Sequence, residues 1–250
     1  MIVTDRKITR YKHGSSESLL DPVICEEWFN LYLNNKLIYQ TPVLDQEIDA
    51  LIEGLLYVKG HIKEKEGYDV EQKGRSWYVS SETAKSGHPF RQMVENAFSE
   101  INSGVHLPRV ASDRVYRADE ILNLMGEFQK LPSVYHKTGG VHMAAFATDR
   151  ILYWADDVSR RNSVDKVIGK VLLGGRNLED GIFVSSGRIS SDIVIRLIKT
   201  GVKLIASVSA PMDRAITLAE YFGITLCGFV RGRRMNIYTH RNRVITDRKG

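Results

Sequence analysis

The feature that most constrains the fold is a regular alternation of short apolar runs and amphipathic segments between residues 141 and 240. Two strands are predicted within residues 141–154, joined at residues 148–150, and further strands at residues 182–185, 203–208 and 224–230. Helices are predicted to begin at Asn162 and to occupy residues 190–200 and 213–222, with glycines at their ends. Residues 235–240 are a candidate for a last strand. This alternation predicts an α/β fold with a mostly parallel sheet covered by helices.

The N-terminal part of the chain has a different pattern. Residues 28–39 predict a β-hairpin that turns at residues 34–36. Apolar residues follow helical spacing across residues 48–56, with Asp45 as the expected N-cap. Residues 59–74 are charged and expected at the surface, and residues 80–108 are expected to form a mobile loop with one helix at 90–101. We therefore expect a smaller strand-rich N-terminal portion, residues 1–110, followed by an α/β domain, residues 111–250.

Composition excludes several classes of protein. No apolar run approaches the ~18 residues of a membrane span, and the first fourteen residues are polar, so we expect a cytoplasmic protein without membrane association. Cys25 and Cys227 are far apart and form no C-x-x-C pair, and the seven histidines form no H-x-E or H-E-x-x-H pattern. A metal site is therefore not expected.

The positive charge is concentrated at one end of the sequence. The last twenty residues contain seven basic residues and one acidic residue, a net charge of +6, whereas the whole chain carries +5. The first 230 residues therefore carry −1. This basic segment is either a solvated tail or the rim of a phosphate-binding site, because lysine and arginine attract anions of any kind.

Four predicted loops would lie at one edge of a parallel sheet, where ligands bind outside the carboxyl ends of the strands. They are residues 156–162, 185–188, 207–211 and 228–234. Together they present arginines, hydroxyls, glycines and the amino ends of three helices, which suit phosphate oxygens. Each loop alone is equally compatible with an ordinary turn. Their coincidence favours a phosphate-bearing ligand, although no P-loop and no G-x-G-x-x-G pattern is present.

At these residues the chain resembles the FdhD/NarQ family. The matching stretches are Thr138-Gly139-Gly140-Val141-His142, residues 156–169, Ser186-Gly187-Arg188-Ile189-Ser190, Ser209-Ala210-Pro211, residues 225–232 and residues 236–240. Fainter similarity lies at Asn34, Thr41-Pro42, Gly54-Leu55-Leu56 and Gly60-His61-Ile62. Within residues 156–169, Ser159 and Arg161 stand where glycine and histidine are common in the family.

The resemblance implies an accessory protein of formate dehydrogenase. Such a protein receives sulfur as a persulfide from a cysteine desulfurase and passes it to the Mo-bis(molybdopterin guanine dinucleotide) cofactor. The resemblance also implies a cytidine deaminase-like three-layer domain without the zinc site. The residues implied to contact the guanine nucleotides are Phe229, Val230, Arg231, Gly232, Arg233 and Arg234. Those implied to line or support the crevice are His142, Arg160, Asp165, Lys166, Arg188 and Ser209.

The family's persulfide cysteine has no counterpart here. It lies in a C-G-x-C-G-type loop before the T-G-G-x-H motif, and the equivalent residues 90–104 contain no cysteine. Sulfur transfer requires a thiolate, so a cofactor-binding chaperone without sulfur transfer is the alternative. Cys227 is a weak replacement, because a buried cysteine within a strand is the more common arrangement. Cys25, which precedes two glutamates, is the poorer candidate.

Several alternatives remain open at this point. His142 could be hydrogen-bonded scaffold, and Asp165 and Lys166 could be ordinary first-turn charges of a helix. A deaminase or hydrolase of the same fold lacks the residues that would hold a metal and activate water. A nucleic-acid binder would interleave aromatics with the arginines, and residues 231–250 contain only Tyr238. We therefore expect no nucleic-acid partner. A homodimer is expected only as the common state of soluble proteins.

Overall fold

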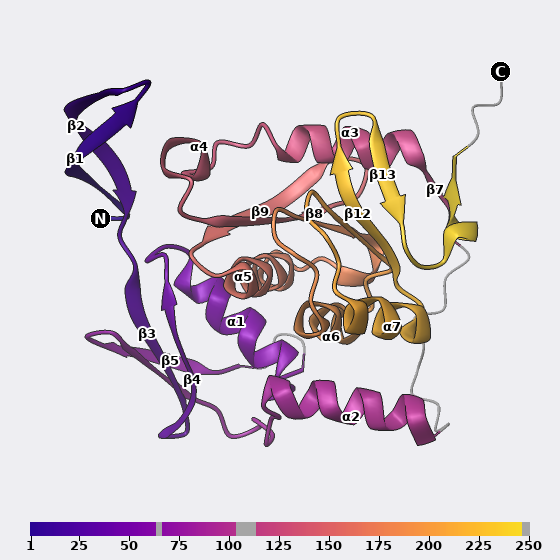
Figure 1. Cartoon of the computed structure of the whole chain (residues 1–250). Coiled ribbons are helices and arrows are strands. Elements are labelled where there is room, and N and C mark those ends of the chain that lie inside the picture. The colour runs from indigo at the N-terminus through magenta and orange to yellow at the C-terminus, as the bar shows by residue number, and fades with distance from the viewer. Residues whose placement is uncertain (64–66, 104–113, 247–250) are drawn as a thin grey trace.

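In a computed structural model, which describes residues 1–63, 67–103 and 114–246, the centre is a six-stranded sheet in the order β13-β12-β11-β10-β8-β9 (Figure 1). The strands are β8 (His142–Ala147), β9 (Ile151–Asp157), β10 (Ile182–Ser185), β11 (Leu204–Ser207), β12 (Thr225–Arg231) and β13 (Arg234–Ile237). The strand positions were thus predicted closely.

The prediction of a mostly parallel sheet was wrong, because the sheet is mixed. Only β10–β11 and β11–β12 pair in parallel, whereas β8–β9, β8–β10 and β12–β13 are antiparallel. For β8–β9 and β12–β13 the cause is the length of the connections. A short turn between neighbouring strands reverses the chain, whereas a parallel pair needs a long crossover. The sequence joins β8 to β9 and β12 to β13 by such short turns.

Helices cover both faces of this sheet, which makes three layers (Figure 1). One face packs on α5 (Arg160–Leu173), α6 (Ser191–Thr200) and α7 (Asp213–Phe222), and the other on α3 (Ala118–Phe128). The short helix α4 (Tyr135–Thr138) follows α3, and two 3₁₀ turns lie at Leu178–Asp180 and Arg241–Arg243. The mixed α/β class is confirmed. A specific relation to the cytidine deaminase fold stays a prediction.

The N-terminal portion contains a second sheet in the order β4-β3-β6-β5. Its strands are β3 (Glu27–Leu33), β4 (Lys36–Val43), β5 (Asp69–Lys73) and β6 (Ser76–Ser80), and helix α1 (Ile48–Val58) packs on it. The predicted hairpin is confirmed. Asn34 and Asn35 have φ of 46° and 65°, as a two-residue turn with positive φ at both central positions requires. The helix predicted at 90–101 is also confirmed as α2 (Phe90–Ser103).

Two details of the N-terminal portion differ from prediction. The N-cap of α1 is Glu47 and not Asp45. The Asp45 carboxylate instead forms an ion pair with the Arg75 guanidinium, at 2.9 Å. Residues 59–74 are not uniformly exposed, since Lys59, His61 and Ile62 are buried. The His61 N–H donates to the Leu56 carbonyl at 2.9 Å, so the chain folds back under the end of α1 instead of leaving into solvent.

A close helix contact joins the N-terminal sheet to the central domain. A Cβ on Gly54 of α1 would lie 1.9 Å from the Asp165 carbonyl oxygen, and one on Gly169 of α5 would lie 1.9 Å from that of Ala50. Only glycine at both positions permits this approach of the two backbones. The predicted boundary between residues 110 and 111 lies outside the described residues, as do residues 104–108 of the expected loop.

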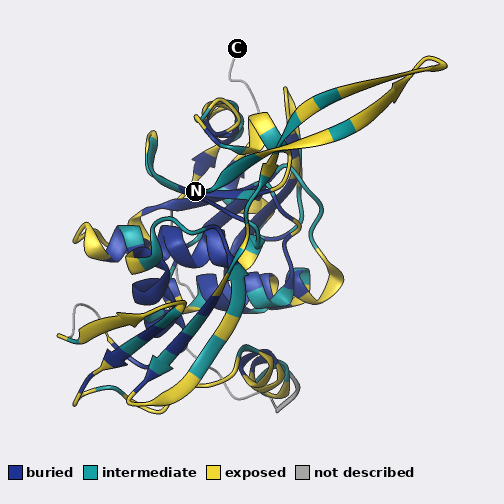
Figure 2. Cartoon of the chain, turned by 90° about the vertical axis from the view of Figure 1, so that its left-hand side faces the viewer, coloured by how far each residue is buried: buried dark blue, intermediate teal, exposed yellow. Residues whose placement is uncertain are grey.

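Two features gave no sequence signal. A hairpin of β1 (Val3–Lys12) and β2 (Ser15–Ile24) projects from the body, and most of its side chains are exposed (Figure 2). Two two-residue strands, β7 (Tyr116–Arg117) and β14 (Val244–Ile245), pair with each other. Among the described residues, no helix is long and apolar enough to cross a bilayer.

Candidate functional site

The four predicted loops converge at one edge of the central sheet. Strand β8 is antiparallel to both β9 and β10, so β9 runs in the same direction as β10, β11 and β12. The carboxyl ends of these four strands therefore lie together, with the start of β8 among them. Helices α5, α6 and α7 begin at the same edge, and their free N–H groups favour anions. We call this the strand-end edge.

Hydrogen bonds between neighbouring loops hold the strand-end edge in shape. The Gly187 N–H donates to the Ser185 hydroxyl at 3.1 Å, and the Ser209 N–H donates to the Ser207 hydroxyl at 3.0 Å. The Ser207 hydroxyl lies 2.7 Å from the Gly187 carbonyl oxygen. The Phe229 N–H donates to the Ser209 carbonyl at 3.1 Å. The loops after β10, β11 and β12 therefore form one connected unit.

A pocket of ≈ 510 Å³ opens at this edge. Within the range of about 300–1,000 Å³, such pockets hold small molecules or cofactors. Its lining combines the end of α3, α4, the T-G-G-x-H segment and the ends of β9, β10 and β11: Phe128, Gln129, Tyr135, His136, Gly139, Gly140, Val141, His142, Met143, Val158, Ser186 and Val208. Of the individually predicted site residues, His142 belongs to this wall.

Three of the predicted arginines flank the pocket. A Cβ on Gly187 would lie 3.0 Å from Arg160 Cβ and 3.4 Å from His142 Nδ1, so these side chains meet over Gly187. Burial lowers the pKa of His142, and the charges of Arg160 and Arg188 lower it further. The Arg231 Nε donates at 2.9 Å to the carbonyl of Val208, a pocket residue.

The positive charge at the strand-end edge is only partly compensated, because Arg161 forms an ion pair with Asp192 in the first turn of α6. Asp156 is buried and accepts hydrogen bonds from the Ser133 hydroxyl and the Val134 N–H. Arg188, Arg231, Arg233 and Arg234 form no ion pair with any residue in the described parts of the chain. The buried Nε of Arg160 also lacks a hydrogen-bond partner there. An uncompensated group of arginines suits an anion.

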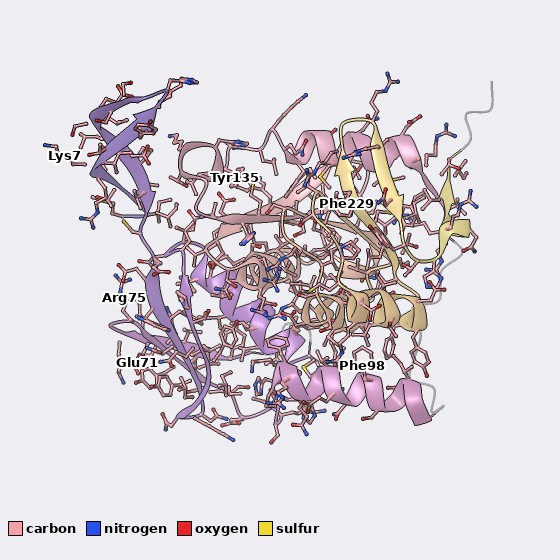
Figure 3. All side chains as sticks on the ribbon, in the orientation of Figure 1. Lys7, Glu71, Arg75, Phe98, Tyr135 and Phe229 are labelled. Atoms are coloured by element: carbon pink, nitrogen blue, oxygen red, sulfur yellow. The ribbon has the colours of Figure 1, made fainter. Side chains whose placement is uncertain are left out.

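Phe229 has an unusual backbone conformation at this edge. Its φ is 52°, the left-handed region in which a bulky side chain is strained. The preceding Gly228 allows the close approach, because a Cβ there would lie 2.8 Å from Pro211 Cδ. The result is an irregular pairing of β12 with β13 that exposes Phe229 while Val230 remains buried. Figure 3 marks Phe229 beside these two strands. Val230 can therefore offer a ligand only its backbone.

The remaining members of the predicted phosphate loop lie at its tip. Gly232, with φ of 56°, forms the turn between β12 and β13, and Arg233 and Arg234 are exposed beside it.

Asp165 and Lys166 lie within the core rather than in the pocket wall. Both oxygens of Asp165 accept from Arg196, at 2.7 and 3.0 Å, and the Lys166 Nζ lies 2.7 Å from Asp157 Oδ2. All four side chains are 0% exposed. Lys166 also donates to the Leu44 carbonyl at 2.9 Å. They are not the first-turn charges of the alternative interpretation either, because α5 begins at Arg160 and has no acidic residue in its first turn; they hold α5 to its neighbours in the core.

The two cysteines lie in different environments. Cys227 is completely buried, and burial raises the pKa of its thiol to about 12. A thiolate is therefore strongly disfavoured there. Cys25 is half-buried at the junction of β2 and β3. Among the described residues, no group of three or more His, Cys, Asp or Glu side chains could hold a metal ion.

Sequence reasoning missed the aromatic side of the pocket. Tyr135 and His136 come from α4, with their rings 5.9 Å apart in an edge-on contact. Their position directly before Thr138-Gly139-Gly140 was a usable signal. Ser186 was recognised only as part of a loop. Its hydroxyl accepts from the Met143 N–H at 2.9 Å and its own N–H donates to the Met143 carbonyl at 3.0 Å, which joins the loop to β8.

Comparison with known proteins agrees with the motifs. The model of the FdhD/NarQ family matches residues 24–245. Proteins named "Sulfur carrier protein FdhD" from Shouchella clausii and Bacillus subtilis are 32% and 30% identical, over 97% and 96% of this chain and the same shares of their own lengths. A counterpart from Listeria monocytogenes is 29% identical over 97% of this chain and 99% of its own.

A solved structure supports the fold. The crystal structure of a formate dehydrogenase accessory protein from Desulfotalea psychrophila superposes with a TM-score of 0.83 at 23% identity, covering 98% of this chain and 100% of that one. The family model therefore spans most of the chain. This chain belongs to the FdhD/NarQ family.

Proposed function

We propose that this protein assists the maturation of formate dehydrogenase by binding Mo-bis(molybdopterin guanine dinucleotide) at the strand-end edge. The observation that carries the proposal is the group of unpaired arginines around a ≈ 510 Å³ pocket formed by the family's own motifs. The cofactor is cargo here, and the protein is its carrier.

The arginines and loops suit the diphosphate of a guanine nucleotide. Arg160, Arg188 and Arg231 surround the connected loops, and each guanidinium can bind phosphate oxygens in a bidentate manner. The amino ends of α5, α6 and α7 lie at the same edge, where they favour negative charge. The pair of negatively charged phosphates would thus meet fixed donors on two sides.

The aromatic wall suits the base. Tyr135 and His136 present flat rings to the pocket, and aromatic rings stack favourably on planar groups. Phe229, exposed beside Arg231, offers a further apolar surface. A guanine base in the pocket and a diphosphate over Gly187 is the arrangement that uses both kinds of group.

A role without sulfur transfer by this chain is the form of the proposal that its thiols support. Cys227 is buried with its pKa raised, and residues 90–104 contain no cysteine. The relatives are named as sulfur carriers, and a cysteine desulfurase is the sulfur donor that we propose for such a role. In this chain, the formate dehydrogenase remains the proposed partner, and the desulfurase is a partner only if a thiol can be loaded.

The direct test is titration calorimetry with GDP on the native chain and on Arg231→Ala/Arg233→Ala. Each charged hydrogen bond lost is worth about 1.5–3 kcal/mol, and 1.4 kcal/mol is a factor of ten. We therefore expect saturable binding that weakens at least roughly tenfold in the variant. The matched control is Arg150→Ala/Arg176→Ala, which removes two exposed arginines away from the strand-end edge and should leave the affinity unchanged. Absence of GDP binding, or equal loss in both variants, would overturn the proposal.

The sulfur step has its own test. The native chain and Cys227→Ser are incubated with a cysteine desulfurase and cysteine, and persulfide is detected by mass spectrometry of the intact protein. We expect no persulfide on Cys227 under native conditions, since the thiol is inaccessible. A persulfide that is present on the native chain and absent from Cys227→Ser would show that Cys227 can be loaded with sulfur, which would contradict this form of the proposal.

A further inference from the structure

A second pocket, of ≈ 390 Å³, lies in the N-terminal portion. It is formed by the β3–β4 turn, the residues after α1 and residues 84–89. In Figure 1, β3 and β4 lie at the lower left and the β12–β13 hairpin at the upper right, so this pocket is separate from the strand-end edge. The proposed cofactor site contains none of its residues.

The lining of this second pocket is strongly basic. It contains Lys36, Lys59, Lys85, His61 and His88 and no acidic residue. None of the three lysines forms an ion pair with residues 1–63, 67–103 or 114–246. A concave surface with one sign of charge concentrates ligands of the opposite sign.

Lys59 is the least expected of these residues, because it is 7% exposed. Its Nζ donates to the Ile38 carbonyl at 3.1 Å and lies 5.6 Å and 5.3 Å from the ring centres of Tyr39 and Phe90. Burial lowers its pKa, and the charge of Arg196 adds to the effect, while the charge of Asp165 opposes it. A buried ammonium that carbonyl and ring contacts only partly stabilise gains strongly from an anion at the pocket side.

The remaining wall is firmly held. His61 Nδ1 lies 2.9 Å from the Lys85 carbonyl oxygen and 3.0 Å from the Gly87 nitrogen. A Cβ on Gly87 would lie 2.5 Å from His61 Cε1, so the loop backbone rests directly on the imidazole. Asn34 exchanges two hydrogen bonds with the Ser81 backbone, at 2.9 and 3.1 Å. These bonds hold the β3–β4 turn against the chain that leads into residues 84–89. The cationic groups are thus carried on a built scaffold.

We propose that the second pocket binds a small ligand that carries a doubly charged oxyanion, either inorganic phosphate or a phosphate monoester. Lysine ammonium groups bind phosphate as point charges, and imidazole N–H groups add donors. The lining contains no Phe, Tyr or Trp, so it offers no platform for a nucleobase. This distinguishes its ligand from the guanine nucleotide of the first pocket.

The test uses the Arg231→Ala/Arg233→Ala chain, so that phosphate bound at the strand-end edge does not imitate the result. Inorganic phosphate and glycerol 3-phosphate are titrated separately, and the imidazole NMR signals of His61 and His88 report the occupied site. Assignments come from His61→Gln and His88→Gln. We expect saturable shifts of both signals with at least one of the two probes. Saturation by phosphate alone would identify the free ion as the ligand, and saturation by both would show that the pocket admits an ester.

The decisive variant is Lys36→Gln/Lys85→Gln, because both side chains are exposed and their removal leaves the core intact. We expect it to weaken binding at least tenfold. Lys7→Gln/Lys12→Gln on the exposed β1–β2 hairpin is the matched control and should bind as before. GDP affinity of the otherwise native chain should be unchanged by Lys36→Gln/Lys85→Gln, which separates this site from the proposed cofactor site. Linear, unsaturable shifts, or equal binding in both lysine variants, would overturn the proposal.

Discussion

The charged residues of α5 and those of the β12–β13 hairpin lie in opposite environments. Asp165 and Lys166 have completely buried side chains with ion-pair partners at 2.7 Å. Arg231 and Arg233 are exposed and have no acidic partner in the described parts of the chain. Both sets belong to motifs that resemble the family. The comparison shows that a charge in a motif points to a ligand only when the fold leaves it unpaired.

The largest effect is expected from breaking the buried pair. Asp165→Asn leaves the buried Arg196 guanidinium with only its longer ion pair, to Asp192 at 3.7 Å, and removing one partner of such a buried pair costs about 3–5 kcal/mol. Urea unfolding followed by circular dichroism would measure the loss of unfolding free energy. The control is Asp165→Leu/Arg196→Met, which removes both charges and should be more stable than Asp165→Asn. GDP affinity of the folded Asp165→Asn protein should match the native value, and a specific loss of GDP binding would assign Asp165 to the site.

The contact between α1 and α5 should be the next most sensitive. Gly54→Ala places a methyl group 1.9 Å from the Asp165 carbonyl oxygen, and overpacking of this kind costs about 1–3 kcal/mol or more. Gly126→Ala in α3 is the matched control, because a Cβ there meets no atom within 4 Å. Alanine is a better helix former than glycine by about 1 kcal/mol, so Gly126→Ala should be neutral or stabilising in the same urea experiment. Equal effects of the two substitutions would contradict the close packing.

Local sequence patterns predicted the elements of the central sheet well and their directions poorly. Residues 182–185 and 213–222 were placed correctly, because apolar periodicity and glycine stops act within a few residues. The direction of β8 depends on which strand it pairs with, which no local pattern contains. Even so, the four ligand-facing loops were predicted at one edge, because β9 to β12 share a direction despite the two hairpins. The β1–β2 hairpin was missed, since its exposed polar strands carry no apolar alternation.

The site was predicted unevenly for the same reason. Arg160, Arg188, Arg231 and His142 do lie near one another around Gly187 and Val208. Tyr135 and His136 were not found, because α4 reaches the pocket only through the tertiary placement of the segment after α3. The second pocket was also not predicted from the sequence. Its residues are separated by some fifty positions in the sequence, and Lys59 was expected at the surface.

A substitution at the strand-end edge should have the opposite profile to those in the core, with a larger effect on ligand binding than on stability. Gly187→Ala would place a methyl group 3.0 Å from Arg160 Cβ and 3.1 Å from Arg160 Cδ, so the arginine has to move while the core is untouched. We expect GDP binding to weaken about threefold to tenfold, near 1 kcal/mol, with a change in unfolding free energy below about 0.5 kcal/mol. Calorimetry and urea unfolding on the same preparation would measure the two quantities. A large loss of stability with unchanged GDP affinity would reverse the roles assigned to the two regions.

The smallest expected effect is a pH dependence of GDP binding through His142. In the free protein, burial and then Arg160 and Arg188 lower the pKa of His142, so the imidazole is neutral at neutral pH. A bound diphosphate beside it would favour the imidazolium and raise that pKa, so binding would take up a proton. Affinity should therefore rise as the pH falls from about 8 to about 6, the range around the ordinary histidine value of about 6.5. Because the terminal phosphate of GDP itself titrates near pH 6, the comparison is with His142→Gln, which keeps the contribution of the ligand alone. A steeper pH dependence in the native chain than in His142→Gln would place the diphosphate beside His142, and identical slopes would place it away from that side chain, toward the arginines of the β12–β13 hairpin.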